Sequence, residues 1–217
     1  MNDVIEIIPA VIPKSFAELE AAAKLVAPHC SWLHVDVMDG VFVPNTTIQN
    51  PLEFHQLKTS LKLEAHLMIW ATPEARNAWF DSPAERLIWH VEAFDSPDEI
   101  KRTVESTKAI GKQVGLALNP ETPLSAVEPY LDKLDTVLVM TVKPGFAGQK
   151  FEESVIPKIA ALRQIWPNGT ISVDGGIRVG TARQVVAAGA RRLAAGSALF
   201  GVGDFVEALR LLRGTTV

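Results

Sequence analysis

The feature that most constrains the fold of this chain is a repeated alternation of short apolar runs with longer amphipathic segments. Short runs rich in Val, Ile and Leu are typical of parallel strands that helices cover on both faces. Strands are predicted at Ile5–Val11, Trp32–Met38, Leu61–Met68, Arg86–Val91, Gln113–Leu118, Thr136–Val142, Thr170–Val173 and Arg192–Ala195. Helices are predicted at Ser15–Ala27, Glu74–Phe80, Pro97–Ile110, Pro123–Tyr130, Glu152–Ile165, Thr181–Ala188 and Val202–Arg213, with a shorter one at Pro51–Leu57. Units averaging roughly 27 residues suit a closed α/β architecture, the (β/α)8 TIM barrel.

An open, doubly wound sheet is the alternative arrangement of the same elements. Such a sheet usually has a glycine-rich loop after its first strand, but Pro9–Pro13 contains no glycine. Ser15 with Glu18 forms a capping-box pattern, and Thr72 is a second expected helix cap. With no linker or low-complexity segment, we expect residues 1–217 to form a single barrel domain.

Composition excludes several classes of protein. The net charge is −4 and no basic block occurs, which argues against a nucleic-acid partner. Cys30 is the single cysteine, so no internal disulfide is expected and a reducing compartment is favoured. The first eleven residues include Asp3 and Glu6 and lack the pattern of a signal peptide, and no apolar run reaches membrane-spanning length. These features predict a cytoplasmic protein that does not enter a membrane.

Polar residues interrupt the apolar runs close to the ends of three predicted strands. His34 and Asp36 are two residues apart, so they share one face of a strand; His66 and Asp174 occupy similar places. Each alone could be a hydrogen-bonded core residue. Because catalytic groups of (β/α)8 barrels gather at the carboxyl ends of strands, the four together favour a divalent-metal site. Imidazole and carboxylate donors suit Zn, Fe, Mn or Co.

Further residues are expected beside this site. His90 is either a partner that orients a ligand or simply a histidine at the rim, and the sequence leaves both readings open. Met38, Met68 and Met140 all fall near strand ends, which favours an apolar collar over the reacting atoms above ordinary core filling.

Three glycine-containing segments follow the last three strands. Glycines allow backbone N–H groups to converge on an anion, and barrels commonly hold phosphate after strands seven and eight. The sequence therefore predicts a phosphate cup formed by Gly145, Phe146, Ala147, Gly148, Gly175, Gly176, Gly196 and Ser197.

These motifs together resemble the ribulose-phosphate 3-epimerase family. The resemblance rests mainly on the block His34–Gly40 and the block Met140–Gln149, and it extends over nearly the whole chain. It implies a barrel of the ribulose-phosphate binding type that holds one divalent metal cation per chain. It further implies a homo-oligomer, a dimer or higher, that interconverts D-ribulose 5-phosphate and D-xylulose 5-phosphate.

The resemblance also implies roles for individual residues. His34, Asp36, His66 and Asp174 would be the metal ligands, and Asp36 and Asp174 would also be the two acid/base groups. In one direction Asp36 would accept a proton and Asp174 would donate one on the opposite face of the substrate. A metal would act as a Lewis acid that stabilises the enediolate. The three methionines and the glycine segments would contact the phosphorylated ketose.

Several positions differ from the family pattern. Ala10 replaces a serine, Gln49 a glycine, Lys143 an asparagine and Ala147 a glycine. None is a proposed ligand or base, so they bear on substrate identity. Alternatives are therefore an epimerase for a ketohexose 6-phosphate and a barrel that binds a sugar phosphate without turnover. A related aldolase or decarboxylase is disfavoured, because Asp36–Asp39 lacks the lysine of their Asp-x-Lys-x-x-Asp motif.

Overall fold

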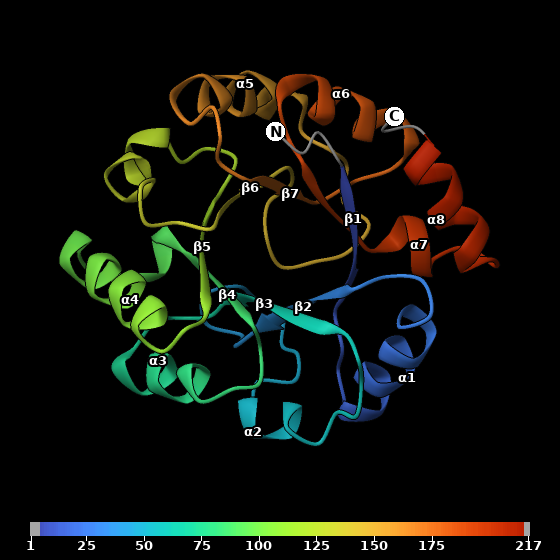
Figure 1. Cartoon of the computed structure of the whole chain (residues 1–217), viewed down its shortest axis with the longest axis horizontal. Coiled ribbons are helices and arrows are strands. Elements are labelled where there is room, and N and C mark those ends of the chain that lie inside the picture. The colour runs from blue at the N-terminus through green and yellow to red at the C-terminus, as the bar shows by residue number, and fades with distance from the viewer. Residues whose placement is uncertain (1–4, 215–217) are drawn as a thin grey trace.

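A closed ring of parallel strands, surrounded by helices, makes up the computed structural model, which describes residues 5–214 (Figure 1). Residues 1–4, part of the segment for which no signal peptide is predicted, and residues 215–217 lie outside the described residues. Each strand pairs in parallel with the next, and β1 pairs with β8 to close the barrel. The strands are β1 Glu6–Val11, β2 Trp32–Met38, β3 Lys62–Met68, β4 Arg86–His90, β5 Gln113–Leu118, β6 Thr136–Met140, β7 Ile171–Asp174 and β8 Arg192–Ala195.

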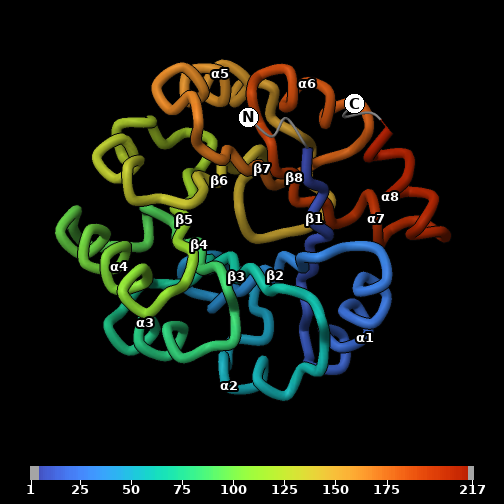
Figure 2. Tube along the Cα trace, in the orientation of Figure 1, coloured from blue at the N-terminus to red at the C-terminus, as the bar shows by residue number. Residues whose placement is uncertain are grey.

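Helices follow the strands around the outside of the ring. The α-helices are α1 Phe16–Val26, α2 Pro51–Phe54, α3 Pro73–Phe80, α4 Pro97–Ala109, α5 Ile156–Ile165, α6 Val179–Ala188, α7 Ser197–Phe200 and α8 Phe205–Gly214. Short 3-10 helices are η1 Val91–Ala93, η2 Leu124–Ala126, η3 Glu128–Tyr130 and η4 Glu153–Val155. The gold segment that follows β6 curves across the centre of the ring in the tube view (Figure 2). No helix in the range 5–214 combines the length and apolar character needed to cross a membrane.

The predicted barrel and its eight strands are confirmed. Strand ends differ from the sequence prediction by at most two residues, the largest shift being that β6 ends at Met140 rather than Val142. Two predicted helix caps are also present. Ser15 Oγ accepts a hydrogen bond from the Glu18 N–H at 3.3 Å, and Thr72 Oγ1 accepts one from Ala75 at 3.2 Å.

Proline changes two of the predicted helices. The helix predicted over Pro123–Tyr130 is wrong, because this segment forms only η2 and η3. Pro129 lacks an N–H and disfavours α geometry at the residue before it, so one continuous helix cannot pass through. The helix predicted over Glu152–Ile165 starts later, at Ile156, since Pro157 is tolerated only in a first helical turn.

The C-terminal helix also starts later than predicted, and a short helix before it was not predicted. The sequence predicts one helix from Val202, whereas α7 precedes a break and α8 begins at Phe205. Asp204 Oδ1 accepts a hydrogen bond from the Glu207 N–H at 3.0 Å. This side chain therefore caps the start of α8, which explains why the helix begins after Asp204.

The barrel interior has an apolar half and a polar half. The main apolar core lies between the strands and the surrounding helices, where outward-facing Val, Leu and Ile side chains are buried. Inside the ring, an apolar cluster fills the side formed by β4 to β6; its members are Ile88, Ala117, Leu138, Met140 and Val142. The inward face of β2 and β3 instead carries charged and imidazole side chains. Arg86 and His90 of β4 and Asp174 of β7 add further polar side chains to the interior.

Candidate active site

Strand register brings the predicted ligands together. His34 and Asp36 are two residues apart on β2 and share its inward face. Asp36 is the register partner of His66 on β3, which places those two side chains next to each other. Asp174 is the last residue of β7, so its carboxylate reaches the same end of the barrel.

The four side chains form one contact cluster. One potential ligand atom from each lies within 4.8 Å of the others. Asp36 Oδ1 is 2.8 Å from His66 Nδ1 and 3.3 Å from His34 Nε2. His66 Nδ1 is also 3.6 Å from Asp174 Oδ2. Both histidines are fully buried.

The cluster fits a divalent cation. His34 Nε2 is buried and, among the described residues, has no hydrogen-bond partner, although it faces Asp36. A buried nitrogen without a partner is costly unless something binds its lone pair. Two imidazoles and two carboxylates are donors that first-row divalent metals accept. The predicted ligand residues are therefore arranged so that they could hold one cation, whose identity the donors do not fix.

The two carboxyl groups have different electrostatic surroundings. Burial opposes ionisation of Asp36, but the adjacent imidazoles of His34 and His66 hold the pKa of this carboxyl well below its usual range. Burial and the nearby charge of Asp36 raise the pKa of Asp174 to about 7. Without a cation, Asp36 is therefore the ionised partner and Asp174 the one that holds a proton more readily.

The histidines also differ from each other. Burial lowers the pKa of His66 to about 4, which outweighs its hydrogen bond to Asp36. Burial disfavours the charged form of His34 too, but the neighbouring carboxylates of Asp36 and Glu64 raise its pKa well above the usual value. His66 is thus uncharged and could bind a cation as a neutral imidazole. At His34, a cation would have to replace a proton.

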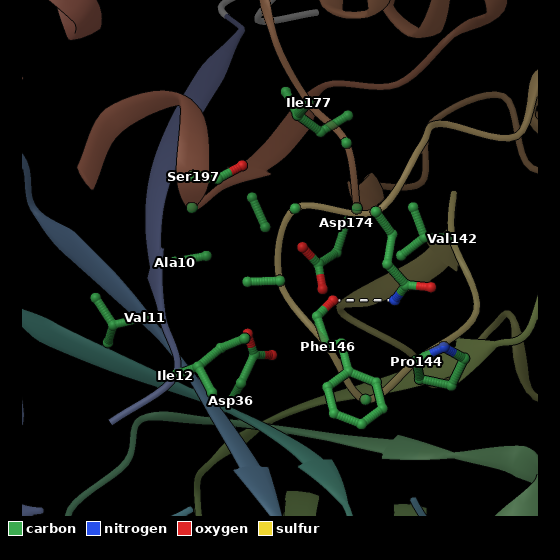
Figure 3. A pocket seen from close by; sticks show the side chains of 18 of the residues that line it. Ala10, Val11, Ile12, Asp36, Val142, Pro144, Phe146, Asp174, Ile177 and Ser197 are labelled. Atoms are coloured by element: carbon green, nitrogen blue, oxygen red, sulfur yellow. Dashed lines mark hydrogen bonds between the residues drawn. The ribbon is translucent and has the colours of Figure 1, made fainter. Parts of the chain in front are cut away.

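A cavity of about 420 Å³ opens above the cluster. Asp36 and Asp174 both project into it (Figure 3), while His34 and His66 lie beneath its lining. All other predicted substrate residues line the cavity: Met38, Met68, Met140, Gly145, Phe146, Ala147, Gly148, Gly175, Gly176, Gly196 and Ser197. The structure therefore brings the methionines and all three glycine segments to one space.

Glycine is required at the β7–α6 turn. Gly175 has φ +112°, and a Cβ there would lie 2.4 Å from Val142 Cγ2. Gly176 has φ +61°, and its Cβ would lie 3.0 Å from the Phe151 backbone N. Side chains are thus excluded both by conformation and by the close approach of the segment that follows β6. This leaves the backbone exposed to the cavity.

The positions that differ from the family pattern separate into two groups. Ala10 and Ala147 line the cavity, but Gln49 and Lys143 are exposed and lie outside its lining. Of the four positions expected to bear on substrate identity, only Ala10 and Ala147 therefore border the cavity. Gln49 follows the buried Ile48 in the loop before α2.

Two carboxylates behind the histidines were not predicted. Glu64 Oε1 accepts from His34 Nδ1 at 2.6 Å. His90 Nε2 is 2.9 Å from His66 Nε2, and His90 Nδ1 is 3.2 Å from Glu92 Oε2. Of the two readings of His90, this geometry favours the partner that orients a ligand. Glu64 and His66 are two residues apart on β3, so their side chains point to the same face of the strand. This spacing is the sequence feature from which a place for Glu64 beside the site could have been predicted.

Hydrogen bonds connect the loops that follow β1, β2 and β6 near the cavity. Asn45 Nδ2 donates to the Gly145 carbonyl at 2.8 Å, which joins the loop after β2 to the loop after β6. Lys14 Nζ donates to Asn45 Oδ1 at 2.5 Å. Gln149 Nε2 donates to the Phe146 carbonyl at 3.0 Å, the bond dashed in Figure 3. These bonds hold the segment 145–148 over the carboxylates.

Fold and site together define a (β/α)8 barrel with a polar, metal-competent cluster at the carboxyl ends of its strands. Residues 6–200 match the "Ribulose-phosphate 3 epimerase family". The chain belongs to this family, which makes it a carbohydrate epimerase, an enzyme of the isomerase class.

Curated relatives support the same family. The chain is 44% identical over 215 residues to the chloroplastic ribulose-5-phosphate-3-epimerase of Arabidopsis thaliana, covering 95% of this chain and 75% of the relative. It is 39% identical over 219 residues to the ribulose-phosphate 3-epimerase of Bacillus subtilis, covering 97% and 99% of the two chains.

Solved structures share the fold at much lower identity. A 3-hexulose-6-phosphate synthase from Salmonella typhimurium gives a TM-score of 0.71 at 18% identity, covering 98% of each chain. An orotidine 5'-phosphate decarboxylase from Pyrococcus horikoshii OT3 gives 0.67 at 16% identity, covering 97% of this chain and 98% of the other. These two show the barrel alone.

Proposed function

We propose that this chain interconverts D-ribulose 5-phosphate and D-xylulose 5-phosphate by moving a proton at C3. The observation that carries the proposal is the convergence of Asp36 and Asp174, from two separate strands, into one cavity. Family membership supports the substrate class, because the curated relatives carry the name of this epimerase.

Inverting the carbon beside a ketone requires a proton to leave one face and another to arrive on the other. In the ring, β2 and β7 are separated by β1 and β8, so the carboxylates of Asp36 and Asp174 enter the cavity from different sides. Asp36 accepts the proton from one face, and Asp174 donates one to the other; the reverse reaction exchanges these roles. The higher proton affinity of Asp174 in the metal-free chain agrees with this direction.

His34, Asp36, His66 and Asp174 would hold a divalent cation. When bound, that cation would supply a Lewis acid that stabilises negative charge developing on the ketone side of the substrate. His66 keeps the carboxylate of Asp36 oriented through its hydrogen bond to Oδ1.

The other residues that line the cavity would contact two different parts of the substrate, its phosphate and its carbon skeleton. The three glycine segments would hold the phosphate, since their backbone is unobstructed by side chains. Met38, Met68 and Met140 would cover the carbon skeleton and exclude water from the carbanion-like intermediate. The homo-oligomeric state and the cytoplasmic location stay predictions.

A metal analysis joined to a turnover assay tests the proposal. The purified protein should convert ribulose 5-phosphate and contain about one divalent cation per chain. His66→Ala should lower metal content and abolish turnover, because it removes a central donor of the cluster. His55→Ala is the matched control, since His55 is exposed and lies outside the cluster. Full metal content and activity in His66→Ala would contradict the site, and preference for a ketohexose 6-phosphate would favour the alternative substrate.

A further inference from the structure

Two fully buried charged side chains have no part in the proposed proton transfer. Glu64 and Arg86 point into the barrel from β3 and β4, and both are 0% exposed. They are register partners, and Arg86 Nη1 donates to Glu64 Oε2. A buried ion pair seldom stabilises a fold more than well-packed apolar residues would, because desolvation offsets the attraction. Stability alone therefore gives no reason for this pair.

The pair continues directly into the metal-competent cluster. His34 is the register partner of Glu64, and its Nδ1 lies 2.6 Å from Glu64 Oε1. An ionised carboxylate only accepts hydrogen bonds, so His34 Nδ1 must carry the proton. The other ring nitrogen, Nε2, then faces Asp36 with no hydrogen-bond partner among the described residues.

Arg86 is itself held in place. Its Nε and Nη2 donate to Gln113 Oε1 on β5, at 2.8 Å and 2.6 Å. Its guanidinium carbon lies 4.0 Å from the centre of the Trp32 ring, a cation–π contact. A guanidinium fixed on two sides leaves the Glu64 carboxylate one orientation, in which one oxygen faces Arg86 and the other faces His34.

We propose that Glu64 and Arg86 are positioning residues that prepare His34 to bind the cation. Glu64 fixes the ring and its tautomer so that Nε2 presents its lone pair to the cluster, and Arg86 balances and orients Glu64. This inference rests on the proposed metal site. Partners of this kind typically alter metal affinity by roughly 10- to 100-fold.

The test measures Co²⁺ affinity by chelator competition and the visible spectrum of the bound Co²⁺, without any activity assay. Glu64→Leu/Arg86→Met removes both charges together, so no unpaired buried charge remains. We expect its dissociation constant for Co²⁺ to rise roughly 10- to 100-fold, with an altered spectrum. Glu64→Gln/Arg86→Met restores an amide oxygen that can accept from His34 Nδ1, so it should recover most of the affinity.

A second ion pair on neighbouring strands supplies the control. Arg192 Nε donates to Glu6 Oε2 at 2.7 Å, and neither residue is one of the four proposed ligands. Glu6→Leu/Arg192→Met should therefore bind Co²⁺ like the unaltered chain. Should Glu64→Leu/Arg86→Met fail to fold, as judged by thermal unfolding without metal, Glu64→Met/Arg86→Leu takes its place with the same readout.

The outcomes separate the two proposals. Unchanged Co²⁺ affinity and spectrum in the apolar double variant, with binding by the unaltered chain, would overturn the positioning role alone. Equal losses in the apolar and the glutamine variants would also overturn it, because the acceptor at Nδ1 would then be irrelevant. Absence of Co²⁺ binding by the unaltered chain would overturn the metal site and this inference with it.

Discussion

Asp36 and Asp174 carry the same functional group, but their neighbours give them different proton affinities. Two buried imidazoles, those of His34 and His66, favour the ionised form of Asp36, whereas burial and the charge of Asp36 oppose ionisation of Asp174 more strongly than His34 and the Gly175 N–H favour it. Two carboxyl groups whose surroundings separate their pKa values are typical of acid/base pairs. The proposed roles of Asp36 as proton acceptor and Asp174 as proton donor therefore agree with the surroundings of each carboxyl group.

Ala10 is the substitution in the cavity with the most direct expected consequence. It lines the cavity and is 6% exposed. Ala10→Ser would add a hydroxyl facing the substrate, and one neutral hydrogen bond contributes roughly 0.5–1.5 kcal/mol. We predict that KM for ribulose 5-phosphate falls by about three- to tenfold, with kcat nearly unchanged. Steady-state kinetics checks this, and a rise in KM would show that the cavity has no room for the hydroxyl.

The residues of the candidate site could be predicted because polar side chains at strand ends interrupt otherwise apolar runs. His34, Asp36, His66 and Asp174 each stood out in this way, and all four meet in the structure. Glu64 did not stand out, because it lies near the start of β3 beside the exposed Lys62, where a charge suggests solvent. Its partners come from other strands, and sequence patterns do not report such contacts.

At the level of elements, periodicity predicted the strands well and the helices less well. Parallel strands buried on both faces give continuous apolar runs, so their limits are visible in the sequence. Helix limits depend on single residues: Pro129 splits one predicted helix into 3-10 turns, and Asp204 sets the start of α8. These effects depend on local geometry rather than on composition averaged over a segment.

The β7–α6 turn should be intolerant of a side chain. Gly175→Ala combines a positive φ with a Cβ that collides with Val142, and overpacking of this kind costs about 1–3 kcal/mol beyond the cost of the backbone conformation. We predict a lower free energy of unfolding in urea and a raised KM. Gly111→Ala is the matched control, since Gly111 has φ +78° but nothing within 4 Å of its Cβ. Equal losses of stability in both variants would show that the collision is relieved without cost.

At the scale of the whole molecule, an apolar cluster fills the interior beside β4 to β6, whereas charged and imidazole side chains enter it from β2, β3, β4 and β7. The polar half keeps ionisable side chains out of water, a cost that a bound cation and matched charges offset. Binding of the cation should therefore be coupled to folding, because an unfolded chain lacks the cluster.

Removal of metal should lower global stability. A ligand present at one hundred times its dissociation constant stabilises the folded state by about 2.7 kcal/mol. We predict that a chelator lowers Tm and that added divalent cation restores it, as measured by calorimetry. His66→Ala should show a smaller shift, because it lacks one of the donors. If chelator leaves Tm unchanged in protein that is shown to contain metal, the prediction that metal binding stabilises the folded state is contradicted.

The most direct test of the central claim is the fate of the hydrogen at C3. With ribulose 5-phosphate in deuterated water under single-turnover conditions, the product should carry one solvent deuterium at C3, seen by mass spectrometry and NMR. This result follows because the proton taken by Asp36 differs from the proton given by Asp174, and both side chains project into the cavity. Product that fully retains its original C3 hydrogen would contradict epimerisation by two solvent-exchanging carboxylates.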